Sequence, residues 1–63
     1  MRLFNKRICS TIAWRRLYKA GSDALDIYRV KQAETCFTRA ILKSCTVEQR
    51  AMSYHMLGIA QRI

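Results

Sequence analysis

The sequence predicts an all-α fold: one small domain spanning residues 1–63, a helical hairpin plus a docking C-terminal helix, expected to be homodimeric. The chain has no proline and two glycines, so few residues interrupt helices. Apolar residues recur at spacings of three and four, the period of an amphipathic helix. Hydrophobic residues make up 51% of the 63 positions, an excess over what so short a chain can bury, and this favours self-association or a partner protein.

The first predicted helix runs from Thr11 to Ile27. Its apolar stripe consists of Trp14, Leu17, Tyr18, Gly21, Ala24, Leu25 and Tyr28, with Trp14 as the expected core anchor. The middle of this stripe is small, which lets another helix approach closely. Because glycine in a helix interior costs about 1 kcal/mol relative to alanine, the alternative is a break at residues 21–23, with Ser22 as a new N-cap.

The second predicted helix runs from Val30 to Lys43. Its stripe consists of Val30, Ala33, Phe37, Ala40, Ile41 and Ser44. Extending this register backward reaches Asp26 and Asp23, which are polar, so the stripe changes phase near Arg29. We therefore expect a tight turn between the first two helices, although no glycine or proline marks it.

The third predicted helix runs from Val47 to Gln61, after a loop at residues 44–45 and a capping box formed by Thr46 and Gln49. It carries two apolar strips. One consists of Val47, Ala51, Tyr54 and Gly58, with Leu57 beside it, and the other of Met52, Met56, Ile59 and Ile63. A three-helix core needs only one strip, and methionine suits contact surfaces, so the second strip is the predicted protein interface. The alternative is that both strips are buried in a single core.

The formal charge of +8 is concentrated at the beginning of the chain. Residues 1–19 contain no acidic side chain, and their cations are the predicted nucleic-acid or anion contacts: Arg2, Lys6, Arg7, Arg15, Arg16 and Lys19. Residues 1–9 form either a basic arm or the start of the first helix. The alternative for this charge is a solvated surface that keeps a hydrophobic protein in solution.

Site chemistry points away from an enzyme, and we expect no catalytic residue, no cofactor, no metal and no small-molecule substrate. Cys9, Cys36, Cys45 and His55 lack the close cysteine spacing of structural zinc sites. Without a long apolar run or the apolar core of a secretory signal, the expected location is cytoplasmic, and in such a reducing compartment we interpret the three cysteines as free thiols. No apolar run is long enough for a transmembrane segment.

Two resemblances accompany this interpretation. Ala33, Phe37 and Ala40 resemble the Ala-x3-Phe-x2-Ala pattern of the second helix of a tetratricopeptide repeat, and Leu57-Gly58 resembles the Leu-Gly pair in the first helix of a following repeat. Gly and Tyr are exchanged at Tyr18 and Gly21 relative to that signature. The resemblance implies one helical hairpin with a docking helix and not a superhelical array.

The chain also resembles the PerC/ANR-type small regulators carried by phages and plasmids. The motif residues are Tyr28, Arg29, Val30, Ala33, Phe37, Ala40, Glu48 and Arg50. This resemblance implies a small regulatory or accessory protein, encoded by a temperate phage or a plasmid, that acts by protein–protein interaction on a host or regulatory target. The alternatives are a direct nucleic-acid-binding protein and a small subunit of a larger assembly.

Overall fold

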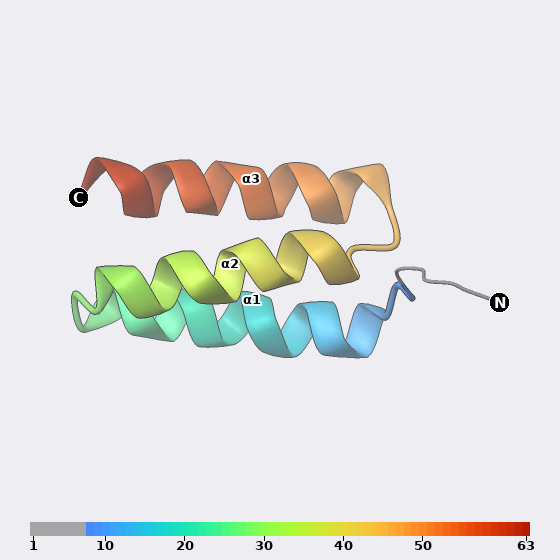
Figure 1. Cartoon of the computed structure of the whole chain (residues 1–63), viewed down its shortest axis with the longest axis horizontal. Coiled ribbons are helices and arrows are strands. Elements are labelled where there is room, and N and C mark those ends of the chain that lie inside the picture. The colour runs from blue at the N-terminus through green and yellow to red at the C-terminus, as the bar shows by residue number, and fades with distance from the viewer. Residues whose placement is uncertain (1–7) are drawn as a thin grey trace, which may run out of the picture.

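The computed structural model describes residues 8–63 and shows three α-helices: α1 (Thr11–Asp26), α2 (Val30–Lys43) and α3 (Val47–Arg62). The helices lie side by side, and consecutive helices run in opposite directions (Figure 1). No strand occurs between residues 8 and 63. The structure confirms the all-α three-helix prediction, and each predicted helix end lies within one residue of the observed one.

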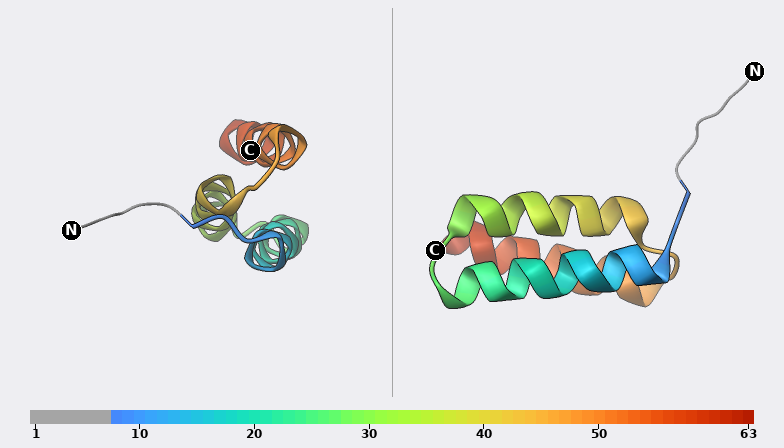
Figure 2. Two further views of the ribbon diagram at one scale, coloured as in Figure 1. Left: turned by 90° about the vertical axis from the view of Figure 1, so that its right-hand side faces the viewer. Right: turned by 90° about the horizontal axis from the view of Figure 1, so that it is seen from below.

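The central helix is α2. Viewed along the helix axes, α1 and α3 lie on different sides of it (Figure 2, left). The α1–α2 turn and the C-terminus lie at one end of the domain, and the α2–α3 loop and the start of α1 lie at the other (Figure 1). Both outer helices therefore pack mainly on α2.

The core is built from small side chains around one aromatic ring. Phe37 of α2 is fully buried, and the alanines of its cluster are Ala24, Ala33 and Ala60. An ideal Cβ atom on Gly21 would lie 2.7 Å from Cζ of Phe37, so the missing side chain makes room for the ring. Because this close packing offsets the helix penalty of glycine, α1 continues through Gly21, and the alternative break at residues 21–23 does not occur.

Aromatic contacts extend this core along α1. The Trp14 and Tyr18 rings stack at a centroid distance of 5.2 Å, and the Tyr18 ring meets Phe37 edge-on at 5.7 Å. Both geometries are favourable for aromatic pairs. Trp14 is only 8% exposed, which confirms its predicted role as a core anchor.

The packing face of α3 differs from both predicted strips. Its fully buried residues are Ser53 and Ala60. The larger side chains packed against the core are Met56, from the second strip, and Leu57, which lies beside the first strip. The prediction that one intact strip supplies the core is therefore wrong, and so is the alternative in which both strips are buried. The small residues allow α3 to approach the hairpin closely, and they leave most of both strips at the surface.

The α1–α2 turn closes without glycine or proline, as expected from the change of phase at Arg29. Tyr28 adopts a φ of 60°, in the left-handed region. Its N–H donates to the Leu25 carbonyl at 3.0 Å, and the Arg29 N–H donates to the Ala24 carbonyl at 2.8 Å. These are the two hydrogen bonds of a Schellman C-cap. Tyr28 is 79% exposed, so its predicted place in the apolar stripe of α1 is wrong.

Replacing Tyr28 with glycine is expected to raise the free energy of unfolding by about 1 kcal/mol, because glycine adopts a positive φ without steric cost. The tyrosine side chain is largely in solvent, so little packing is lost. Urea denaturation followed by circular dichroism measures the change. The matched control is Tyr28→Ala, which keeps the Cβ atom and gains nothing from the turn. Equal stability of the two variants would contradict the prediction.

Candidate interaction surfaces

The predicted cationic contacts are described only in part. Arg2, Lys6 and Arg7 lie outside the described residues. Arg15, Arg16 and Lys19 are exposed on α1, and the Lys19 ammonium lies 3.3 Å from the Asp23 carboxylate in an exposed ion pair one helical turn away. Within residues 8–63, the Arg15 and Arg16 guanidinium groups make no ion pair. These two arginines are therefore the cations of α1 best placed to meet an anionic partner.

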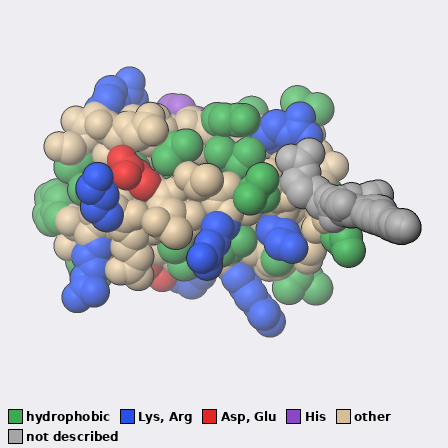
Figure 3. Space-filling view, in the orientation of Figure 1, with side chains coloured by type: hydrophobic (Ala, Val, Ile, Leu, Met, Phe, Trp, Pro, Cys, Tyr) green, Lys and Arg blue, Asp and Glu red, His purple; other side chains and the backbone are tan. Residues whose placement is uncertain are grey.

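Positive charge is not confined to α1. Further exposed cations are Arg29, Lys31, Arg39, Lys43, Arg50 and Arg62. The face in Figure 3 shows Lys and Arg side chains spread along the domain, with few acidic groups between them. The described surface is thus broadly cationic, and the concentration of charge in residues 1–19 remains a property of the sequence.

The predicted protein interface is divided between the core and the surface. Met56 packs against the core cluster, and Ile59 is half-buried. Met52 is 43% exposed and Ile63 is 63% exposed. The surface part of this strip, which we call the Met strip, is therefore Met52 and Ile63, with the half-buried Met56 and Ile59 between them along the helix.

The strip assigned by sequence to the core is largely exposed. Val47 is 78% exposed, Tyr54 is 56% exposed, and an ideal Cβ atom on Gly58 would have no atom within 4 Å. The prediction of the packing face of α3 relied on its large apolar residues. The signal that it missed is the pair of small residues Ser53 and Ala60, which are spaced seven apart and therefore share one side of α3.

A buried polar network joins α1 to α3. The Trp14 indole N–H donates to the Ser53 hydroxyl at 2.8 Å, and this hydroxyl donates to the Gln49 carbonyl at 2.9 Å. The Gln49 side chain donates from Nε2 to the Thr11 hydroxyl at 3.3 Å. Burying a polar group is costly unless it is hydrogen-bonded, so this network sets the position of α3 on α1.

Replacing Ser53 with alanine is expected to lower the free energy of unfolding by about 1–3 kcal/mol, because the buried Trp14 N–H loses its acceptor. Denaturant unfolding measures the loss. In a Trp14→Phe background, which lacks the indole N–H, the same Ser53→Ala change should cost less. An equal cost in both backgrounds would show that the hydrogen bond contributes nothing to stability.

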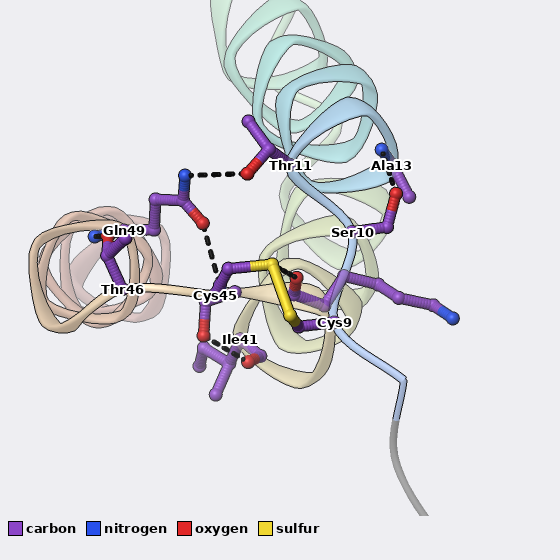
Figure 4. Close-up of a disulfide and its surroundings, with 10 residues drawn as sticks. Cys9, Ser10, Thr11, Ala13, Ile41, Cys45, Thr46 and Gln49 are labelled. Atoms are coloured by element: carbon purple, nitrogen blue, oxygen red, sulfur yellow. Dashed lines mark hydrogen bonds between the residues drawn. A yellow bond between two sulfur atoms is a disulfide. The ribbon is translucent and has the colours of Figure 1, made fainter.

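The predicted capping box is correct for Thr46 but not for its partner. The Thr46 hydroxyl accepts from the Gln49 N–H at 3.0 Å, as expected. The Gln49 side-chain oxygen, however, accepts from the Cys45 N–H at 2.7 Å, one residue before the cap (Figure 4). Gln49 therefore fastens the α2–α3 loop to α3, and through Thr11 it also reaches α1.

Two of the three predicted thiols form a disulfide. Cys9 and Cys45 are bonded across a sequence separation of 36, and their Cα atoms lie 5.0 Å apart, within the range that a disulfide spans (Figure 4). Close by, the Ser10 N–H donates to the Lys43 carbonyl at 2.9 Å, and the Ser10 hydroxyl caps α1. The interpretation of Cys9 and Cys45 as free thiols is wrong, whereas Cys36 on α2 is free.

Other kinds of site have no counterpart in the described chain. Residues 8–63 contain no group of three or more His, Cys, Asp or Glu side chains arranged to hold a metal ion. They enclose no pocket. None of the three described helices has the length and apolar character needed to cross a membrane. Comparison with protein-family models, with curated proteins and with solved structures gives no match to this chain.

Proposed function

We propose that this protein is a non-enzymatic regulatory or accessory protein that acts by binding another protein, a host or regulatory target. The observation that supports the proposal is the Met strip, where Met52 and Ile63 are exposed after folding. These side chains lie on the same side of α3, and exposed apolar surface is characteristic of contact sites. Methionine is flexible and polarizable, so it adapts to the shape of a partner.

The charge of the domain specifies the chemistry of that partner. Every helix carries exposed cations, and residues 8–63 contain only four acidic side chains. A surface of this sign attracts an acidic protein and speeds its association. We therefore propose a target that presents an apolar groove or patch bordered by acidic side chains.

Affinity capture from the native host tests this proposal. Met52→Glu places a charge on the Met strip without disturbing the core, since Met52 is 43% exposed. A partner that binds the wild type and is lost with Met52→Glu supports the proposal, and reversal of Arg15 and Arg16 to Glu should weaken the same complex. Recovery of the same proteins with wild type and Met52→Glu would rule out the Met strip.

Direct nucleic-acid binding is the second candidate, and it is favoured by Arg15 and Arg16, which are exposed and form no ion pair within the described part of the chain. Phosphate contacts release counterions, so the affinity for random duplex DNA should fall steeply as the salt concentration rises. Fluorescence anisotropy across a salt series measures the slope. Arg15→Gln with Arg16→Gln should make it shallower, and absence of binding even at low salt would reject this function.

The third candidate is a small subunit of a larger assembly, for which the same exposed apolar residues would be contacts within the complex. The expected cytoplasmic location went together with three free thiols, whereas Cys9 and Cys45 are paired. Disulfides persist mainly in oxidising compartments. Thiol alkylation of the protein in intact host cells, followed by mass measurement, establishes whether the bond exists where the protein works.

A further inference from the structure

One side of α3 points away from the rest of the domain. Val47, Ala51, Tyr54 and Gly58 follow one another at spacings of four, three and four, so they share this side, which we call the Tyr54 face. Val47 and Tyr54 are 78% and 56% exposed. The domain is held instead by Ser53 and Ala60, on another side of the helix. The Tyr54 face is therefore an apolar helix face that its own fold does not use.

Gly58 leaves an open space on this face. Nothing lies within 4 Å of an ideal Cβ atom at this position, in contrast to Gly21, whose missing side chain accommodates Phe37. Glycine destabilises a helix interior relative to alanine, and the domain gains no internal packing from it here. Tyr54, one turn earlier, is the bulky residue of the same face. The face thus presents a projection and a hollow side by side.

The charges along one edge of the face are complementary to those of a second copy that runs antiparallel. Glu48, His55 and Arg62 are spaced seven apart and exposed, so they form a row along one edge of the Tyr54 face. The row begins with an acid and ends with a base. A second copy running antiparallel keeps the same edges together and sets its Arg62 beside Glu48 and its Glu48 beside Arg62.

The register that pairs Glu48 with Arg62 also brings the bulky Tyr54 of one copy close to Gly58 of the other. It sets Tyr54 of each copy opposite position 56 of the other, and because a helical side chain leans toward its own N-terminus, the tyrosine reaches toward Gly58 of the other copy. Arg50, on the other edge, then lies opposite position 60 of the second copy, and the two Arg50 side chains are separated by roughly 15 Å along the helices. The sizes of Tyr54 and Gly58 and the charges of Glu48 and Arg62 are therefore compatible with the same antiparallel pair.

We propose that the Tyr54 face binds the same face of a second copy, forming an antiparallel two-fold dimer with Tyr54 packed on Gly58 of the other copy. Arg15 and Arg16 lie on α1 and not on the Tyr54 face, so these two cations are not brought into the contact. One helix face per copy is a small contact area, so the association should be reversible and depend on concentration.

Sedimentation equilibrium of the full chain tests the dimer. The wild type should approach twice the 7.4 kDa subunit mass as its concentration rises to roughly 0.1 mM. Gly58→Gln fills the hollow with a neutral side chain that meets no atom of its own domain, so it should remain folded but monomeric. Thr38→Gln, at an exposed position of α2, is the matched control and should associate like the wild type.

Charge reversal tests the antiparallel orientation. Glu48→Arg alone and Arg62→Glu alone should each weaken the dimer, and the two changes together should restore it, with circular dichroism confirming the helix content of each variant. A monomeric wild type would overturn the proposal, as would a dimer that survives Gly58→Gln or a double reversal that does not recover. Dissociation by Met52→Glu but not by Gly58→Gln would overturn it in favour of the Met strip.

Discussion

Replacing Phe37 with alanine is expected to lower the free energy of unfolding by about 3–5 kcal/mol. Phe37 is the largest completely buried side chain of the described residues, and the other buried members of its cluster are alanines, which are too small to fill the space that the ring would leave. A domain of this length has a total stability on the order of 3–9 kcal/mol. The variant should therefore be largely unfolded at ordinary temperature, and circular dichroism during urea denaturation measures how much structure remains.

The reciprocal change at Gly21 tests the same contact from α1. Gly21→Ala adds a Cβ atom 2.7 Å from Cζ of Phe37, which is closer than real contacts allow, so the fully buried ring would have to shift against the residues packed around it. We expect Gly21→Ala to destabilise the protein, although alanine is the better helix former. In a Phe37→Leu background, which removes the far edge of the ring, the added methyl should cost less. An identical cost in both backgrounds would contradict close packing of Gly21 on Phe37.

The helices themselves were predictable because their signals are local. Thr46 is followed three residues later by Gln49, the apolar spacing of α2 is regular, and the change of phase at Arg29 marks a turn. Each of these depends on residues close in sequence. At Tyr28, local spacing gives the wrong prediction, because this residue fits the apolar stripe of α1 but is not buried. The chain turns through a left-handed conformation at Tyr28, and the side chain lies in solvent.

The candidate surfaces were harder to predict because they depend on how α3 is rotated about its own axis. Apolar residues occur on most sides of α3, so periodicity alone does not select the buried side. The rotation is set by contacts distant in sequence: the Trp14 indole finds Ser53, and the core accepts Ala60 where a larger residue would not fit. A preference for large apolar residues therefore selects the wrong side of α3 for the core.

The pairing of Cys9 with Cys45 also depends on distant contacts. Three cysteines with no close spacing indicate no disulfide by themselves. The pairing becomes visible only when the antiparallel hairpin brings the start of α1 beside the end of α2, where the Ser10 N–H donates to the Lys43 carbonyl. An odd cysteine count is thus compatible with one bond and one thiol, and the position of the thiol, Cys36 on α2, is settled by the fold.

Removing this disulfide is expected to lower the free energy of unfolding by about 2–4 kcal/mol, because the bond restricts the unfolded chain across a long loop. Cys9 and Cys45 are both exposed, so a reductant has access to the bond in the folded protein. Dithiothreitol should lower the melting temperature of the wild type by about 4–8 °C for each kcal/mol lost. Cys9→Ser with Cys45→Ser should show the lower melting temperature with or without reductant.

The control for the disulfide is Cys36→Ser, which removes the free thiol and should leave the response to dithiothreitol intact. Loss of the disulfide should first loosen the end of the domain that contains Cys9 and Cys45, since the bond keeps the N-cap residue Ser10 beside Lys43. Amide hydrogen exchange under reducing conditions should therefore quicken in the first turn of α1 before the Phe37 core responds. A wild type whose melting temperature is unchanged by dithiothreitol would show that the hairpin contacts alone hold α1 on α2.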